Sequence, residues 1–188
     1  MSVQEIILPV DSKDSLISAR TLGTIGMICS PLLYFASLLS PQNLDAPNPN
    51  QIYASLCAIL YLFGAMATVT AMRNLRVTGS GTGAAILYVI QITGLSLAML
   101  FDVMESTAPR LKQTTVFFVA DMAYPFSHIM FVVLGIAVVK AGVWRGWRRV
   151  PAFLVGLALP LFFSLLALFG RENANFIFPV LGCVDITT

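Results

Sequence analysis

The stretch VFFVADMAYPFSHIMFVVLGIAVV, residues 116–139, decides the fold class of this chain. As a helix it would rise about 36 Å at 1.5 Å per residue, and the hydrocarbon core of a bilayer is about 30 Å thick. Of the whole chain, 57% of residues are apolar and only 11% are charged. This composition is typical of a membrane protein, so the stretch predicts a transmembrane helix.

Comparable apolar runs lie on both sides of this stretch. The predicted spans cover residues 21–40, 53–72, 84–103, 116–139, 150–169 and 174–188. The last run has only about 15 residues, which rise about 22 Å and fall short of a full crossing. We expect an all-α integral membrane protein: one domain over residues 20–188, a bundle of five to six transmembrane helices with an incomplete or short sixth helix.

Basic residues are unevenly divided between the two sides of these spans. One side has Lys13, Arg20, Arg73, Arg76, Lys140, Arg145, Arg148 and Arg149, and the other has Arg110, Lys112 and Arg171. The positive-inside rule then places the amino terminus in the cytoplasm and favours a cytoplasmic (inner) membrane. Residues 1–19 contain acidic residues before any long apolar run, so we expect a cytoplasmic arm and not a secretory signal.

The charge and the cysteines exclude several classes of protein. A net charge of +2 without a basic stripe argues against binding to nucleic acid. The three cysteines lack CxxC spacing and lie in apolar runs, which indicates buried free thiols. No motif indicates a cofactor, and the expected partners are membrane lipids, with a homodimer or a larger membrane complex as alternatives.

The loop after residue 139 is predicted to lie at the lipid headgroups. Tryptophan and arginine are enriched at that level of a membrane. The predicted anchor consists of Trp144, Arg145, Trp147, Arg148 and Arg149. Small residues spaced three or four apart also predict close helix contacts. These pairs are Gly23 and Gly26, Gly64 and Thr68, and Gly94 and Ala98.

The 116–139 span carries an unusual set of polar residues for its depth in a membrane. Asp121 and His128 are seven positions apart and lie on one helix face, flanked by Tyr124 and Pro125. Pro125 has no amide hydrogen, so the carbonyl of Asp121 loses its usual partner and a kink is expected. Ionisable groups at membrane depth are costly unless they are paired or reached by water, which makes them candidates for function.

Counting depth along the helices brings other polar residues to the same level. His128, Gln91, Asp185 and Cys29 fall near the middle of the membrane at 1.5 Å per residue. We therefore predict a binding cavity formed by Asp121, Tyr124, His128, Gln91 and Asp185. Asp102 and Glu105 lie nearer the outer surface and predict an acidic vestibule above this cavity.

Three interpretations of the predicted cavity stay open. It is a hydrogen-bonded layer that holds the helices in register, a site that binds or transports a small molecule, ion or lipid, or an intramembrane metal or acid/base enzyme acting on a lipid-like substrate. His128 and Asp185 would be the metal ligands of such an enzyme. A single histidine and the lack of HExxH and GxSxG motifs disfavour catalysis. The sequence favours binding or transport through an outward-opening polar cavity, with an accessory subunit of a larger membrane complex as the main alternative.

Overall fold

The computed structural model describes residues 17–39, 49–144, 146, 150, 156, 157, 160, 161, 164 and 168. Within these residues, four helical segments are long and apolar enough to cross a membrane, and no β-strand occurs. The chain is therefore all-helical in its described part and has the features of an integral membrane protein. Residues 1–16, most of the predicted span 150–169 and all of 174–188 lie outside the described residues.

The helices follow one another in an antiparallel order. The first span consists of α1 (Ala19–Cys29) and α2 (Leu32–Leu39), and the others are α3 (Gln51–Asn74), α4 (Thr82–Thr107) and α5 (Thr115–Ala141). The short 3-10 helix η2 (Pro109–Gln113) joins α4 to α5. Helices of 24, 26 and 27 residues rise about 36–40 Å, more than a bilayer core requires.

The first span differs from the uninterrupted helix expected over residues 21–40. It is broken between Cys29 and Leu32, because Pro31 has no amide hydrogen and cannot continue the hydrogen-bond ladder of α1. Helical hydrogen bonding resumes directly after this break, since the carbonyl of Pro31 accepts from the amides of Tyr34 and Phe35 at 3.1 and 3.3 Å. The first span is thus two short helices joined at Ser30 and Pro31.

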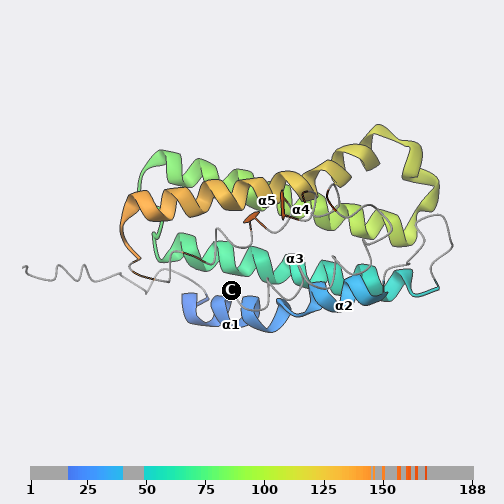
Figure 1. The fold of residues 1–188 in the computed structure, drawn as a ribbon, viewed down its shortest axis with the longest axis horizontal. Helices are drawn as coiled ribbons and strands as arrows, with labels where there is room; N and C mark the ends of the chain where they lie inside the picture. Colours follow the sequence, from blue (N-terminus) through green and yellow to red (C-terminus); the bar gives the residue numbers. More distant parts are fainter. Residues whose placement is uncertain are drawn as a thin grey trace, which may run out of the picture.

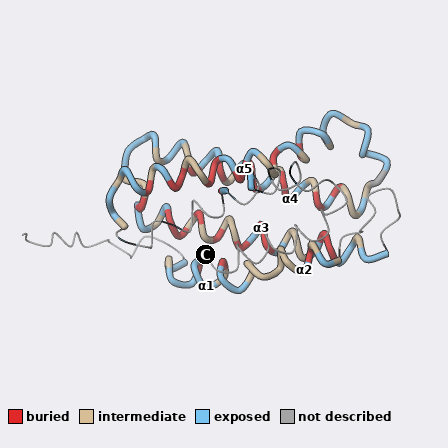
Figure 2. The backbone as a smooth tube through the Cα atoms, viewed as in Figure 1, coloured by how far each residue is buried: buried red, intermediate tan, exposed pale blue. Residues whose placement is uncertain are grey.

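The order of packing is simple. α3 contacts α1 and α2 on one side and α4 on the other, and α4 in turn contacts α5. Figure 1 shows α1 and α2 beside α3, with α4 and α5 forming a second layer. Buried residues line the facing sides of α3, α4 and α5 in Figure 2. Their centre is made by Leu62 and Val69 of α3, Leu95 of α4 and Leu134 of α5, all at most 1% exposed.

The outer faces of the helices are apolar as well. Large exposed side chains include Ile52, Phe63, Val89, Phe118 and Ile129, between 51% and 68% exposed. A water-soluble bundle would carry charged residues on these faces. These exposed apolar faces are therefore suited to contact with lipid.

Small residues bring the helix backbones together where the sequence predicted it. A Cβ atom added at Gly26 would meet the hydroxyl of Thr68, and one at Gly64 would meet Cys29, so α1 and α3 touch backbone to backbone. The predicted contacts at Gly26, Gly64 and Thr68 are therefore confirmed. Gly23 is different, because nothing lies within 4 Å of its Cβ position.

Two turns close the end of the molecule where α3 ends and α4 begins. Arg76 has a positive φ of 51°, and Gly79, three residues later, has a positive φ of 92°. Between them Val77 is fully buried and anchors the turn. α5 ends at the same end of the molecule with Gly142 as a left-handed C-cap at φ 67°.

Candidate functional site

The buried face of α4 carries polar residues along most of its length. Tyr88, Gln91 and Asp102 are 3%, 0% and 8% exposed. Gln91 and Asp102 are eleven positions apart, which is close to three full turns, so they lie on one face about 16 Å from each other. Within the described residues, Gln91 Oε1 and Asp102 Oδ2 are the buried side-chain atoms without a hydrogen-bond partner.

Gln91 connects α4 to the middle of α5. Its Nε2 donates to the carbonyl of Ser127 at 3.2 Å, while its Oε1 is left unbonded. Gly94 lets the two helices meet here, because a Cβ atom at Gly94 would lie 2.6 Å from the hydroxyl of Ser127. That hydroxyl already donates to the carbonyl of Ala123 at 2.8 Å. The contact is therefore held by one interhelical hydrogen bond and close backbone packing.

His128 follows Ser127 and is 4% exposed. Its Nδ1 lies 3.0 Å from the carbonyl oxygen of Tyr124, and the two rings lie 4.8 Å apart at an interplanar angle of 36°. A carbonyl only accepts, so Nδ1 carries the hydrogen, and in the neutral ring Nε2 is then an acceptor. Gly156, in the predicted fifth span, packs against this part of α5, with its Cβ position 3.0 Å from the carbonyl oxygen of His128.

Pro125 shapes α5 between these residues. It lies inside the helix and gives the carbonyl of Asp121 no amide to accept from. Figure 1 shows α5 bent, with its first part inclined away from α4. Asp121 itself is half-buried and takes part in no ion pair within the described residues.

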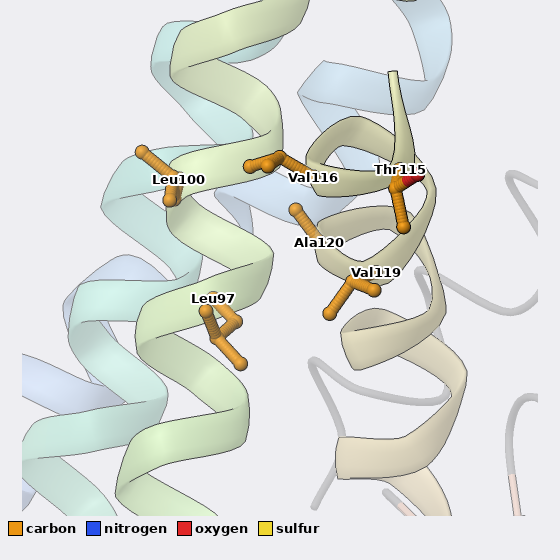
Figure 3. Close-up of a pocket in the computed structure, with 6 residues that line it drawn as sticks. All are labelled: Leu97, Leu100, Thr115, Val116, Val119 and Ala120. Atoms are coloured by element: carbon orange, nitrogen blue, oxygen red, sulfur yellow. The ribbon is translucent and has the colours of Figure 1, made fainter. Parts of the chain in front are cut away.

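An apolar cleft opens between α4 and the first part of α5. It has a volume of about 190 Å³, and six residues line it: Leu97, Leu100, Thr115, Val116, Val119 and Ala120. Figure 3 shows the aliphatic side chains of both helices around this space. None of the predicted cavity residues lines it. The cleft is too small and too apolar to be the predicted polar cavity, since enclosed ligand sites usually exceed about 300 Å³.

The end of the molecule at η2 carries the acidic residues of α4. Asp102 is buried, and Glu105, one turn further on, is half-buried. Glu105 Oε1 lies 3.8 Å from Lys112 Nζ of η2, and this pair adds little stability because Lys112 is exposed to the surroundings. No described cation pairs with Asp102. A proton or a cationic ligand would therefore stabilise its buried carboxylate.

The remaining predicted site residues fall into two groups. Trp144 is half-buried and packs against the core of α3, α4 and α5, and its place at the headgroup level stays a prediction. The others lie outside the described residues, and the interpretations that depend on them stay predictions. These residues are Asp185, Arg145, Trp147, Arg148 and Arg149. Within the described chain, no three His, Cys, Asp or Glu side chains gather to hold a metal ion.

We call Gln91 and Asp102 of α4 with Ser127 and His128 of α5 the polar layer. Two residues at the contact of Gln91 with α5 were not predicted from the sequence as its partners. Ser127 supplies the carbonyl that Gln91 bonds, and Gly94 makes room for it. A signal existed, because Gly94 had been predicted as a contact residue, but its partner helix was not readable from spacing. Cys29, predicted at the same depth as His128, lies at the contact of α1 with α3.

Comparisons with known protein families, with characterised proteins and with solved structures found no match to this chain.

Proposed function

We propose that this membrane protein binds, and passes across the bilayer, a small cationic solute that can donate hydrogen bonds, such as a protonated amine. The observation that carries the proposal is Asp102, which buries a carboxylate at 8% exposure with Oδ2 unpartnered in the described part of the chain. Ionisable residues within membrane spans are rare and mark substrate or ion pathways.

The chemistry of the polar layer supports the same class of ligand. Gln91 Oε1, Asp102 Oδ2 and, in the neutral ring, His128 Nε2 are all acceptors. A ligand that satisfies them must supply donors or positive charge. An anion or a pure acceptor would find no donor among these three atoms.

The order of the residues suggests a route. Asp102 and Glu105 lie toward the η2 end of α4, and Gln91 and His128 lie near the middle of α4 and α5. We propose that a cation is drawn in at the η2 end and then reaches the middle layer. Asp121 and Tyr124 would line the α5 side of this route, and Asp185, outside the described residues, is proposed as a further acceptor.

The experiment is uptake by the purified chain in phosphatidylcholine vesicles, with labelled methylammonium as the probe. Hydrogen bonds to charged groups are worth about 1.5–3 kcal/mol, so Asp102→Asn is expected to reduce uptake about 10- to 100-fold. Asp102→Glu, which keeps the charge, is expected to retain part of it. Ser96→Ala is the matched control, since Ser96 is exposed on the same helix and its hydroxyl bonds the carbonyl of Ile92.

Two results would contradict the proposal. One is uptake by the unchanged protein no faster than by empty vesicles, and the other is equal uptake by Asp102→Asn and the unchanged protein. Either result would favour the alternative of an accessory subunit, in which the buried polar residues serve packing alone.

A further inference from the structure

A second cleft lies between α3 and α4, at the opposite end from η2. It has a volume of about 180 Å³. The residues that line it are Val69, Thr70, Arg73, Tyr88, Val89, Ile92 and Thr93. Its lining includes Tyr88 of the buried polar face of α4 but none of Gln91, Asp102 and His128, so what it binds is independent of the proposed transport function.

The cleft changes character along its length. Arg73 lies in the last turn of α3, the end of a membrane span, where basic residues favour the lipid headgroups. On α4, Val89 and Ile92 lie about 10 and 15 Å inward from the start of the helix. One end of the cleft is therefore cationic. Thr70, Tyr88 and Thr93 add polar groups to its lining, and Val69, Val89 and Ile92 provide the apolar part that continues toward the hydrocarbon region.

The charges around the cleft are of one sign. Among the described residues, Arg20, Arg73, Arg76 and Lys140 all lie at this end of the molecule, in the first turn of α1, the last turns of α3 and α5, and the turn after α3. The three described carboxylates belong to α4 and α5 and lie toward the η2 end. Arg73 is exposed and takes part in no ion pair within the described chain.

We propose that this α3–α4 cleft binds an anionic phospholipid, with the phosphate beside Arg73 and one acyl chain along Val89 and Ile92. A free phosphate would make no use of the apolar part, and Val89 is 60% exposed to the surroundings of the helix. At about 180 Å³ the cleft is smaller than enclosed small-molecule sites, yet a half-open groove of this kind suits one segment of a chain that stays in the bilayer.

The test compares lipids retained by the purified full-length protein, counted by native mass spectrometry. The probes are dioleoyl phosphatidylglycerol and dioleoyl phosphatidylcholine, which share their chains and differ in charge. A cation near an anionic membrane surface contributes an attraction equivalent to about a fivefold change in affinity. Arg73→Gln is therefore expected to lower retained phosphatidylglycerol about fivefold and to leave phosphatidylcholine unchanged.

Two further variants make the outcome decisive. Arg110→Gln removes an exposed cation from η2 at the other end and is expected to change nothing. Val89→Trp fills the cleft without altering charge, at an exposed position that accepts a larger side chain, and is expected to lower phosphatidylglycerol at least as much as Arg73→Gln. The proposal is overturned if Arg110→Gln loses as much lipid as Arg73→Gln, or if Val89→Trp retains as much as the unchanged protein.

Discussion

Gln91 buries its whole side chain within α4, and only the nitrogen of its amide is bonded within the described residues. An unpaired buried acceptor costs about 1–3 kcal/mol. A hydrogen bond between helices in a membrane contributes about 0.6 kcal/mol on average. The cost of the unpaired oxygen exceeds the gain from the hydrogen bond, so helix packing alone does not explain a glutamine at this position.

Replacing this side chain separates packing from binding. Gln91→Leu keeps a similar volume and removes both the bond to Ser127 and the unpaired oxygen, so we expect the free energy of unfolding to rise by about 1 kcal/mol. Methylammonium uptake should fall in the same variant. Unfolding is measured by denaturant titration in mixed micelles, with Ser96→Ala as the unchanged reference. A loss of more than about 1 kcal/mol would mean that the amide oxygen is bonded in the folded protein.

The sequence predicted Gln91 and His128 at one level of the membrane, and in the structure Gln91 bonds the carbonyl of Ser127, the residue before His128. Depth was predictable because rise per residue is fixed in a helix. Rotation was harder to predict, since both lipid and the protein core are apolar and periodicity marks the buried face only weakly. For that reason depth alone could not show that Cys29 faces the contact of α1 with α3.

At the scale of the elements, two prolines act differently on their helices. Pro125 bends α5, which continues from Thr115 to Ala141, whereas Pro31 ends α1 and separates it from α2. The bend in α5 was predicted from the residue itself. The break at Pro31 was not, because a run of apolar residues on both sides gave the same signal as one continuous span.

Two glycines of α1 provide a matched test of the contact with α3. A side chain at Gly26 would meet Thr68 and the Gly64 carbonyl, while nothing lies within 4 Å of the Cβ position at Gly23. Overpacking costs about 1–3 kcal/mol, so Gly26→Val is expected to lower stability by that amount and Gly23→Val by much less. Thermal unfolding of both variants in the same micelles measures the difference. Equal losses would show that helix propensity, and not the α1–α3 contact, determines the result.

At the scale of the whole molecule, charge is divided between the two ends. The described carboxylates lie toward the η2 end, and four of the six described cations lie at the other. The helical membrane fold followed from composition and run length, but the orientation stays a prediction of the positive-inside rule. The number of spans beyond α5 depends on residues outside the described part.

Labelling of single cysteines checks this orientation. In a chain whose natural cysteines are replaced by serine, Ser80→Cys lies in the exposed α3–α4 turn and Gln113→Cys in exposed η2. If the amino terminus is cytoplasmic, a membrane-impermeant maleimide labels Gln113→Cys in intact cells and Ser80→Cys only after the membrane is opened. The reverse labelling pattern would mean the opposite orientation, with the acidic η2 end in the cytoplasm.

The interruption at Ser30 and Pro31 gives the first span a property that the others lack. α1 and α2 have 11 and 8 residues and rise about 16 and 12 Å, so the span is two short rods joined by a hinge. Continuous helices meet a thinner bilayer mainly by tilting, at a cost of fractions of a kcal/mol per ångström of mismatch. A jointed span shortens by folding at its joint. We therefore expect the first span to absorb changes in bilayer thickness, which leaves α3, α4 and α5, and the polar layer that the last two enclose, undisturbed.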